Sequence, residues 1–519
     1  MSPADSRSTL AMLPVISGLS LAFTITAVDP LVLSLNMPQI TRALQVPPEA
    51  VGFLGGAATL VVAAAVLAVG SLGDAFGLKR TLMLGLVGDI AVNLMSALSP
   101  GYIFLLVMRL LDGLALAAVL GVSLALLKLS VPAEKRPAAI GLFMAIEMLL
   151  CGVTPAAGGW VVDNWGWRWL FLLAPLLALI ALGLTARYVV EPPVLDRPRV
   201  DFLGVSLVGV TLLTLVHGIA EAETGITQLQ AWLPLVVSAV AGVLFVLRER
   251  RTPQPVLDLS LFRSGPFTVA ALASLTLNFI VAGFSFALGQ FGAVIMSLPQ
   301  STIGLLYLPG TLAIAGAVIL AGRLIGKYTP RPVLITGLLL MAAGVLLMAA
   351  TAKPTMALWI VVLATWLTNL GSLVTSAAVA ETILSHAPPG KSGAVASVQP
   401  AFGMSGYALG PAVFLLLFNL FFQQQWLNDA DERGISATEA DQAVDATRSA
   451  MARSPGSAGY DPNLLRQSGL DLDLDFTDGL RLTMLIVSLL PLALAVAAYL
   501  IIPRRARAAP QQPSGTAGS

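Results

Sequence analysis

Long apolar runs separated by short polar segments dominate this chain. Fourteen runs approach the length of about twenty residues at which a helix spans a bilayer. The ~10-residue alternating segments of a transmembrane β-barrel are not seen. The pattern therefore predicts an all-α polytopic membrane protein. The predicted helices lie at Leu13–Leu35, Val51–Val69, Thr81–Leu98, Tyr102–Leu129, Ala138–Val162, Trp169–Val189, Phe202–Ala220, Trp232–Leu247, Pro266–Gly289, Thr302–Ala321, Pro332–Ala350, Ala357–Leu384, Gly393–Phe421 and Leu482–Ile502.

Basic residues gather in alternate loops between these helices. The loops on one side carry pairs or groups, among them Lys79 and Arg80, Lys135 and Arg136, and the tail at Arg504 and Arg505. The loops on the other side are nearly bare. By the positive-inside rule, the basic side is cytoplasmic. An even helix count with both termini in the cytoplasm follows.

Composition narrows the class further. Of 519 residues, 57% are hydrophobic and 11% are charged, whereas soluble domains carry about 25% charged residues. A net charge of +1 offers no basic surface for nucleic acid. One cysteine and two histidines allow neither an intrachain disulfide nor a metal-site spacing. We therefore expect no nucleic acid, no metal and no cofactor.

The polar segment Gly70–Arg80, GSLGDAFGLKR, joins the second and third predicted helices. It combines three glycines, one acid and two bases: Gly70, Gly73, Gly77, Asp74, Lys79 and Arg80. We expect a cytoplasmic loop of about ten residues, which places the two helices antiparallel and adjacent. A degenerate copy at Gly322–Arg331 indicates two related halves, with a substrate site near the bilayer midplane between them.

The pattern G-x-L-x-D-x-x-G-x-K-R in this segment resembles the loop signature of the major facilitator superfamily. The resemblance implies that Gly70–Arg80 acts as a conformational latch. In the family, the acid at the position of Asp74 interacts with the positive N-terminus of a second-half helix, which here begins near Gly393. The alternative is a tight basic turn with no further role.

The first helix contains an acid within apolar surroundings, Asp29, and Pro38 nine residues later. This spacing resembles the first-helix motif of the fourteen-helix drug:proton antiporter subfamily. An intramembrane carboxylate is costly and usually faces a cavity or a partner. The resemblance implies that Asp29 carries a proton. The alternative is a structural Asp bonded to a neighbouring helix.

The fourth helix carries Arg109 and Asp112 at i and i+3, on one face. The segment resembles the R-x-x-Q-G motif of the superfamily, with Asp112 where Gln is usual. We expect both residues to take part in proton coupling with Asp29, with Asp112 able to neutralise Arg109 and leave Asp29 free. The alternative is an intrahelical ion pair that only makes the cation tolerable in the membrane.

On the fifth helix, P-x-x-G-G at Pro155, Gly158 and Gly159 resembles the antiporter motif, which implies a bend where proline removes a helical bond. Thr154 stands directly before the proline, where the motif has glycine. Glu147 lies two turns earlier and suits a cationic substrate or a second proton; alternatively it snorkels or pairs locally.

Two polar residues on the twelfth helix, Asn369 and Glu381, are further candidates for substrate binding, with Glu381 near the cytoplasmic end. The acidic segment 422–481 is expected outside. It is either an exposed linker or a folded cap that filters cargo.

The resemblance implies a major facilitator fold with two six-helix bundles and two additional helices. The expected parts are a cytoplasmic N-terminus at 1–12, bundles at 13–190 and 266–503, extra helices within 191–265, and a cytoplasmic tail at 504–519. The resemblance implies a cell-membrane exporter of hydrophobic or amphipathic, cationic drugs, driven by proton antiport.

Other readings of the same pattern stay open. One is an exporter or flippase-like transporter of an endogenous lipid or lipophilic metabolite, and another is a non-transporting sensor or scaffold. A membrane enzyme is not expected, because no nucleophile–base pair or metal set is seen. Small substrates, protons and membrane lipids are the expected partners, and we favour a monomer.

Overall fold

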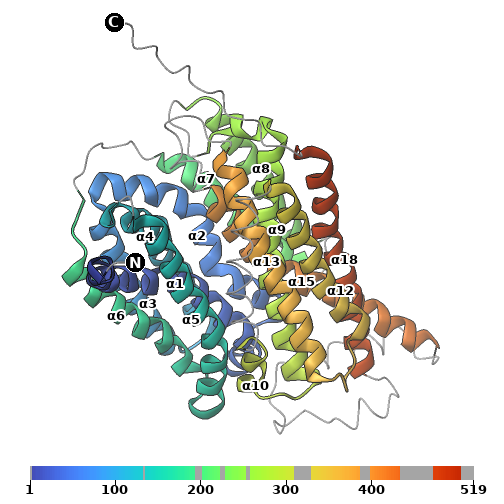
Figure 1. Cartoon of the computed structure of the whole chain (residues 1–519). Coiled ribbons are helices and arrows are strands. Elements are labelled where there is room, and N and C mark those ends of the chain that lie inside the picture. Colours follow the sequence, from blue (N-terminus) through green and yellow to red (C-terminus); the bar gives the residue numbers. More distant parts are fainter. Residues whose placement is uncertain are drawn as a thin grey trace, which may run out of the picture.

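The computed structural model describes residues 3–132, 135–192, 201–222, 228–252, 257–308, 329–385, 398–432 and 472–503, and within these ranges it contains helices and no strand (Figure 1). The longer helices are α1 (Pro3–Leu44), α2 (Pro48–Phe76), α3 (Leu78–Ala97), α4 (Tyr102–Ser130), α5 (Arg136–Trp165), α6 (Leu173–Tyr188), α7 (Phe202–Glu221), α8 (Leu229–Glu249), α9 (Gly265–Gln290), α12 (Pro330–Thr351), α13 (Leu358–Ser385), α15 (Val398–Glu432) and α18 (Leu472–Ile501). Short segments are η2 (Trp167–Leu172), η4 (Leu259–Arg263), η5 (Phe291–Ile295) and α10 (Gln300–Leu305).

Twelve of the described helical stretches are long and apolar enough to cross a membrane, and α2 adds a shorter apolar stretch at Ala50–Val66. The polytopic helical character predicted from the sequence is therefore confirmed. The predicted span Thr302–Ala321 lies mostly outside the described residues. The total of fourteen, and the cytoplasmic termini, stay predictions.

The helices pack as two groups that meet along three seams. In the first group α1 packs on α4, α5 and α6, while α3 packs on α4 and α6 and α2 on α4. In the second, α9 packs on α13 and α15, and α12 on α13 and α18. The seams join α2 to α15, α5 to α10, and α1 to α9. Figure 1 shows the first group in blue to blue-green beside the second in yellow-green, gold, orange and red.

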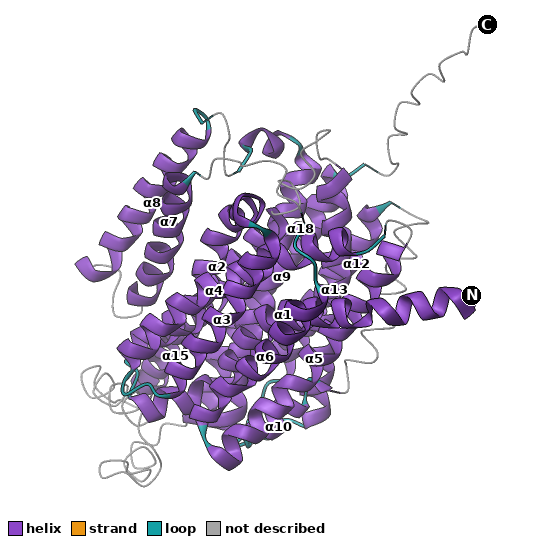
Figure 2. Ribbon diagram, turned by 90° about the vertical axis from the view of Figure 1, so that its left-hand side faces the viewer, coloured by secondary structure: helices purple, strands orange, loops and turns teal. Residues whose placement is uncertain are grey.

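Helices α7 and α8 form a hairpin on the side of this assembly. Helix α7 contacts α2 and α15, whereas α8 packs mainly on α7, and Figure 2 shows the pair at the edge of the molecule. Asp201 caps α7 by accepting a hydrogen bond from the Gly204 backbone N–H at 3.0 Å. Arg248, in the last turn of α8, donates to Asp201 at 2.7 Å. One carboxylate therefore both starts α7 and ties it to the end of α8.

The prediction of a loop of about ten residues at Gly70–Arg80 is wrong. Helix α2 continues to Phe76 and α3 begins at Leu78, so Gly77 alone separates them. Gly77 has φ +106°, a conformation that glycine adopts readily and other residues rarely do. The Lys79 and Arg80 backbone N–H groups each donate at 3.0 Å to the carboxylate of Glu191, which satisfies the first turn of α3. Because Glu191, which follows α6, caps α3 in this way, α3 can begin directly after Gly77.

The acidic segment predicted at 422–481 is shorter than expected at both ends. Helix α15 extends to Glu432 and α18 begins at Leu472, because both helices continue past their apolar stretches. Residues 433–471 lie outside the described residues, as do Gly393 and all but the last residues of Gly322–Arg331. Helix α1 begins at Pro3, within the predicted N-terminal segment 1–12.

Candidate functional site

Five polar side chains from three helices meet inside the first group of helices. Asp29 comes from α1, Asp89 and Asn93 from α3, and Arg109 and Asp112 from α4. Asp29 is 8% exposed and the other four are 0% exposed. Charged groups this deeply buried in an apolar helix bundle are tolerated only when they pair with one another.

Arg109 is the centre of the cluster. Its two terminal nitrogens both donate to the carboxylate of Asp29, Nη1 to Oδ1 at 3.3 Å and Nη2 to Oδ2. The same Nη1 also donates to Oδ2 of Asp112 at 2.9 Å. One guanidinium thus joins a carboxylate on the neighbouring helix α1 to a carboxylate one turn away on its own helix. This shared geometry contradicts the expectation that Asp112 would leave Asp29 free.

Asn93 joins α3 to the same cluster. Its side-chain nitrogen Nδ2 donates to Oδ1 of Asp89 and to Oδ1 of Asp112, at 3.1 Å each. Asp89 and Asn93 stand at i and i+4, so both project from one face of α3 toward α4. Neither residue was predicted from the sequence to belong to the site. The signal was present, since they interrupt an apolar run at helical spacing.

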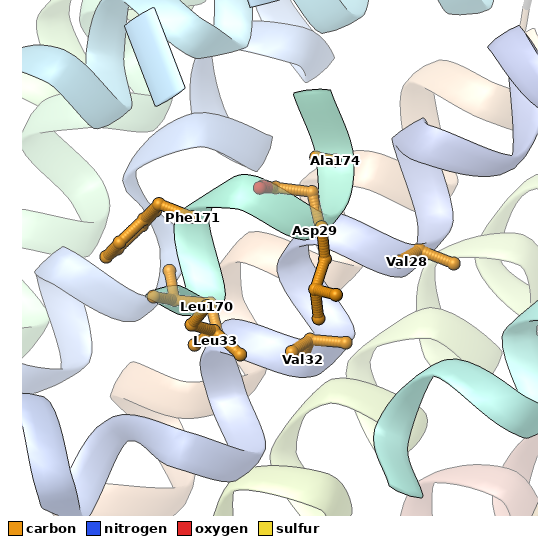
Figure 3. Close-up of a pocket in the computed structure, with 8 residues that line it drawn as sticks. Val28, Asp29, Val32, Leu33, Leu170, Phe171 and Ala174 are labelled. Carbon is orange, nitrogen blue, oxygen red and sulfur yellow. The ribbon is translucent and has the colours of Figure 1, made fainter. Parts of the chain in front are cut away.

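Asp29 is the member of the cluster that borders open space. It lines a small pocket between α1 and the segment that joins η2 to α6. Figure 3 shows Asp29 with Val28, Val32 and Leu33 of α1 facing Leu170, Phe171 and Ala174. Asp29 carries the one ionisable side chain in this lining. A proton exchanging with the cluster from the pocket therefore meets Asp29 first.

The P-x-x-G-G segment of α5 forms the seam with α10. A Cβ added to Gly159 would lie 2.2 Å from the Gln300 carbonyl oxygen, and one added to Gly304 would lie 2.1 Å from the Pro155 carbonyl oxygen. Gly158 packs instead against Val32 of α1. Small residues on both helices allow this close backbone approach. Pro155 lies inside one continuous helix, and the predicted bend stays a prediction.

Other predicted residues are not brought into the cluster by any contact among the described residues. Glu147 is half-buried on α5. Asn369 donates to the Thr365 carbonyl oxygen of its own helix at 2.9 Å, and Glu381 is exposed. Their assignment to substrate binding stays a prediction.

The predicted latch residues lie at the α2–α3 junction. Gly70, Gly73 and Asp74 are in the last turns of α2, and the side chain of Asp74 lies outside the described residues. The Lys79 ammonium donates to the Ala186 carbonyl oxygen at 3.0 Å, and Arg80 is exposed. The role of this segment as a latch is untested. In the part of the chain that the structure describes, no group of three or more His, Cys, Asp or Glu is arranged to hold a metal ion.

Comparison with known proteins identifies the family to which this arrangement of helices belongs. The model of the Major Facilitator Superfamily matches residues 16–411. The multidrug resistance protein Stp of Mycobacterium tuberculosis (strain CDC 1551 / Oshkosh) is 31% identical over 60% of this chain and 59% of its own length. The multidrug efflux pump LfrA of Mycolicibacterium smegmatis is 27% identical over 81% of this chain and 84% of its own. The match thus spans less than two thirds of Stp and most of LfrA.

Solved structures share the fold at low sequence identity. A POT family transporter in complex with 5-aminolevulinic acid superposes with a TM-score of 0.64 at 12% identity, covering 94% of this chain and 96% of that one. A D-xylose–proton symporter superposes with a TM-score of 0.60 at 15% identity, covering 95% and 98%. At this identity the likeness concerns the arrangement of helices alone.

Proposed function

Since this chain belongs to the Major Facilitator Superfamily, we propose that it exports hydrophobic or amphipathic, cationic compounds in exchange for protons. Membership of a transporter family points to a transporter and not to an enzyme. The relatives named as multidrug resistance and efflux proteins support a drug as cargo. The buried Asp29–Arg109–Asp112 cluster is the observation that carries the proton part of the proposal.

The proposed orientation has fourteen helices and both termini in the cytoplasm. The basic residues near Lys79 and in the tail favour this side assignment. The α5–α10 seam near Trp165 is then at the extracytoplasmic end, and the α2–α3 junction is at the cytoplasmic end. In bacteria such a multi-pass protein resides in the plasma membrane.

Proton exchange at Asp29 changes the charge of the cluster. While Asp29 is ionised, it holds Arg109 through two hydrogen bonds. When Asp29 takes up a proton, the ion pair is lost and Arg109 keeps its bond to Asp112. Because α1 also contacts α9 across the seam between the two groups of helices, a change at Asp29 can bias how the groups pack.

Substrate and latch residues complete the proposed mechanism. Glu147, half-buried on α5, is the candidate to meet a cationic substrate, with Asn369 and Glu381 on the second half as weaker candidates. The segment Gly70–Arg80 would hold the cytoplasmic ends together in one state. The energy source is the proton gradient, worth about 2.3 kcal/mol per charge per 100 mV.

The test is transport by the purified protein in proteoliposomes with an imposed pH gradient. Ethidium, a fluorescent amphipathic cation, serves as the probe, and internal pH is recorded together with ethidium movement. We expect Asp29→Asn to abolish both the gradient-driven ethidium movement and the proton flux it induces. Asp478→Asn is the matched control, because Asp478 is half-exposed and pairs with Arg481 on its own helix.

Three outcomes decide between the possible activities. Retained gradient-driven transport by Asp29→Asn removes Asp29 from the coupling role. Movement of a fluorescent lipid but not of ethidium by the wild type replaces the drug with a lipid as cargo. No transport and no substrate-induced proton flux for any probe indicates a sensor or scaffold.

A further inference from the structure

The cluster around Arg109 contains more acid than its one cation can balance. The guanidinium of Arg109 bonds the carboxyl groups of Asp29 and Asp112, and Asn93 links a third carboxyl group, that of Asp89, to Asp112. Asp89 and Asp112 have no exposed surface. If all three were ionised, the site would carry an excess of two negative charges. An uncompensated buried charge is so costly that a group binds a proton instead. At least one of the buried acids behind Arg109 must therefore hold a proton.

Asp89 and Asp112 are the pair that geometry singles out for this role. Oδ1 of each lies 3.1 Å from the same nitrogen, Nδ2 of Asn93. Two carboxyl groups held this close in a dry site cannot both ionise. The second oxygen of Asp89, Oδ2, has no hydrogen-bond partner among the described residues, and neither has Oδ1 of Asn93. A neutral carboxyl at Asp89 leaves no buried charge on that unpartnered oxygen.

We propose that Asp89 and Asp112 share one proton and form a second proton site, positioned by Asn93, which sets the pH at which Asp29 exchanges its proton. This inference rests on the proposed proton antiport. The shared proton resides on one carboxyl or the other, and no other bond changes. When the proton is on Asp112, Asp29 is the one carboxylate that forms an ion pair with Arg109. When the proton is on Asp89, both Asp29 and Asp112 are carboxylates that form ion pairs with Arg109.

The charged groups that face Asp89 are Asp112 and Arg109 of α4 and Asp29 of α1. Among the other elements packed on α3, the sequence of α2 has Glu49 and Asp74 near its two ends, η2 has Arg168, and α6 has Arg187 and Tyr188 in its last turn. Of these, Arg168 donates to the Ser99 carbonyl oxygen beyond the end of α3. The pH response of the pair therefore depends on the cluster itself.

Two isosteric variants give shifts of opposite sign. In Asp89→Asn, Asp112 loses its partner for the shared proton, ionises and pairs with Arg109, so Asp29 is held less firmly as an anion. The pH midpoint of transport should then move to more alkaline values. In Asp112→Asn, Arg109 acts on Asp29 without competition, and the midpoint should move to more acidic values. Neighbouring charges at such distances shift a titration by about one to three pH units.

The experiment measures ethidium transport against pH in proteoliposomes for the wild type, Asp89→Asn and Asp112→Asn. Ser96→Ala is the control on α3, because the buried Ser96 hydroxyl bonds only the Val92 carbonyl oxygen of its own helix. Its midpoint should equal that of the wild type. Unchanged midpoints in both Asp variants, or shifts of the same sign, overturn the proposal.

A second measurement does not depend on transport. Infrared spectroscopy of the purified protein reports the carbonyl stretch of neutral carboxyl groups, and Asp89→Asn should lose one such group relative to Ser96→Ala. An unchanged carboxyl band overturns the shared proton even if transport is proton-driven. A lost band in a protein that moves no protons sustains the shared proton and overturns the antiport instead.

Discussion

Asp163 of α5 holds the first turn of α10 through Ser301. Its Oδ2 accepts a hydrogen bond from the Ser301 backbone N–H at 2.8 Å, and its Oδ1 accepts one from the Gln300 N–H at 3.0 Å. These N–H groups begin a helix and have no partner within it, and a carboxylate there is also favoured by the helix dipole. One side chain thus connects the two groups of helices at the end of α5.

Removing this connection should loosen the α5–α10 seam. We expect Asp163→Ala to lose both hydrogen bonds. The cost in stability should be only about 1 kcal/mol, because the Asp163 side chain is exposed and the freed N–H groups can find other partners. Asp163→Asn keeps one acceptor oxygen and should lose less. The measurement is labelling of a cysteine placed at Leu298, which should become faster in Asp163→Ala. Equal labelling rates in all three proteins would show that the contact does not hold the seam.

The close approach of α5 and α10 predicts that Gly159 tolerates no side chain. In Gly159→Ala the new Cβ would lie 2.2 Å from the Gln300 carbonyl oxygen, so the helices must separate. Overpacking of this kind typically costs about 1–3 kcal/mol. Thermal unfolding in detergent should show a lower Tm, and transport should fall.

Gly141→Ala is the matched control on the same helix. A Cβ at Gly141 meets nothing within 4 Å. Since alanine favours a helix over glycine by about 1 kcal/mol, its Tm should be unchanged or higher. A similar loss of Tm in both variants would contradict an effect specific to the seam.

Two glycines with positive φ, Gly77 at the α2–α3 junction and Gly166 between α5 and η2, are predicted to differ in how much an alanine there lowers the Tm. Gly77→Ala forces alanine into φ +106° and brings its Cβ to 2.9 Å from Oε1 of Glu191. Gly166→Ala meets the same kind of strain at φ +91°, with nothing within 4 Å. Backbone strain in this glycine-favoured region, with positive φ and extended ψ, costs about 1–3 kcal/mol by itself. We expect Gly77→Ala to lower the Tm more than Gly166→Ala, because it also displaces the carboxylate that caps α3. The reverse order would refute the capping role of Glu191.

The α7–α8 hairpin predicts a stability that depends on pH. Hydrogen bonds from the Arg248 guanidinium lower the pKa of Asp201 below its ordinary value. A group with a lowered folded pKa adds stability above its unfolded pKa, about 3.9 for Asp, and loses it as pH falls through the folded pKa. The wild type should thus lose this contribution only below about pH 4.

Asp201→Asn separates the ion pair from the cap. Asn still accepts the Gly204 N–H as an N-cap residue but carries no charge. The Tm difference between wild type and Asp201→Asn should be constant at neutral pH and disappear in acid. Asp201→Ala should lose the cap as well, about 1 kcal/mol more. A difference that persists unchanged in acid would exclude the charge as its cause.

The membrane class, most helix positions and the family could be predicted from the sequence, because they depend on local properties. About twenty apolar residues must form a helix in a bilayer, since no water is present to satisfy the backbone. The same logic singled out Asp29, Arg109 and Asp112, as charges are rare inside membrane helices. The α2–α3 loop was predicted too long, because the cap that shortens it comes from Glu191, over a hundred residues away in sequence.

Only the tertiary structure decided how these residues are joined. The sequence shows Arg109 three residues from Asp112, and local spacing favours that pair alone. The packing of α1 and α3 on α4 instead gives Arg109 two acids and brings in Asp89 and Asn93. The contacts of Asp163 with α10 likewise could not be predicted from the sequence, because they join residues more than a hundred positions apart. Hydrophobic length determines that each helix forms, whereas the charge balance of the site depends on which helix faces meet.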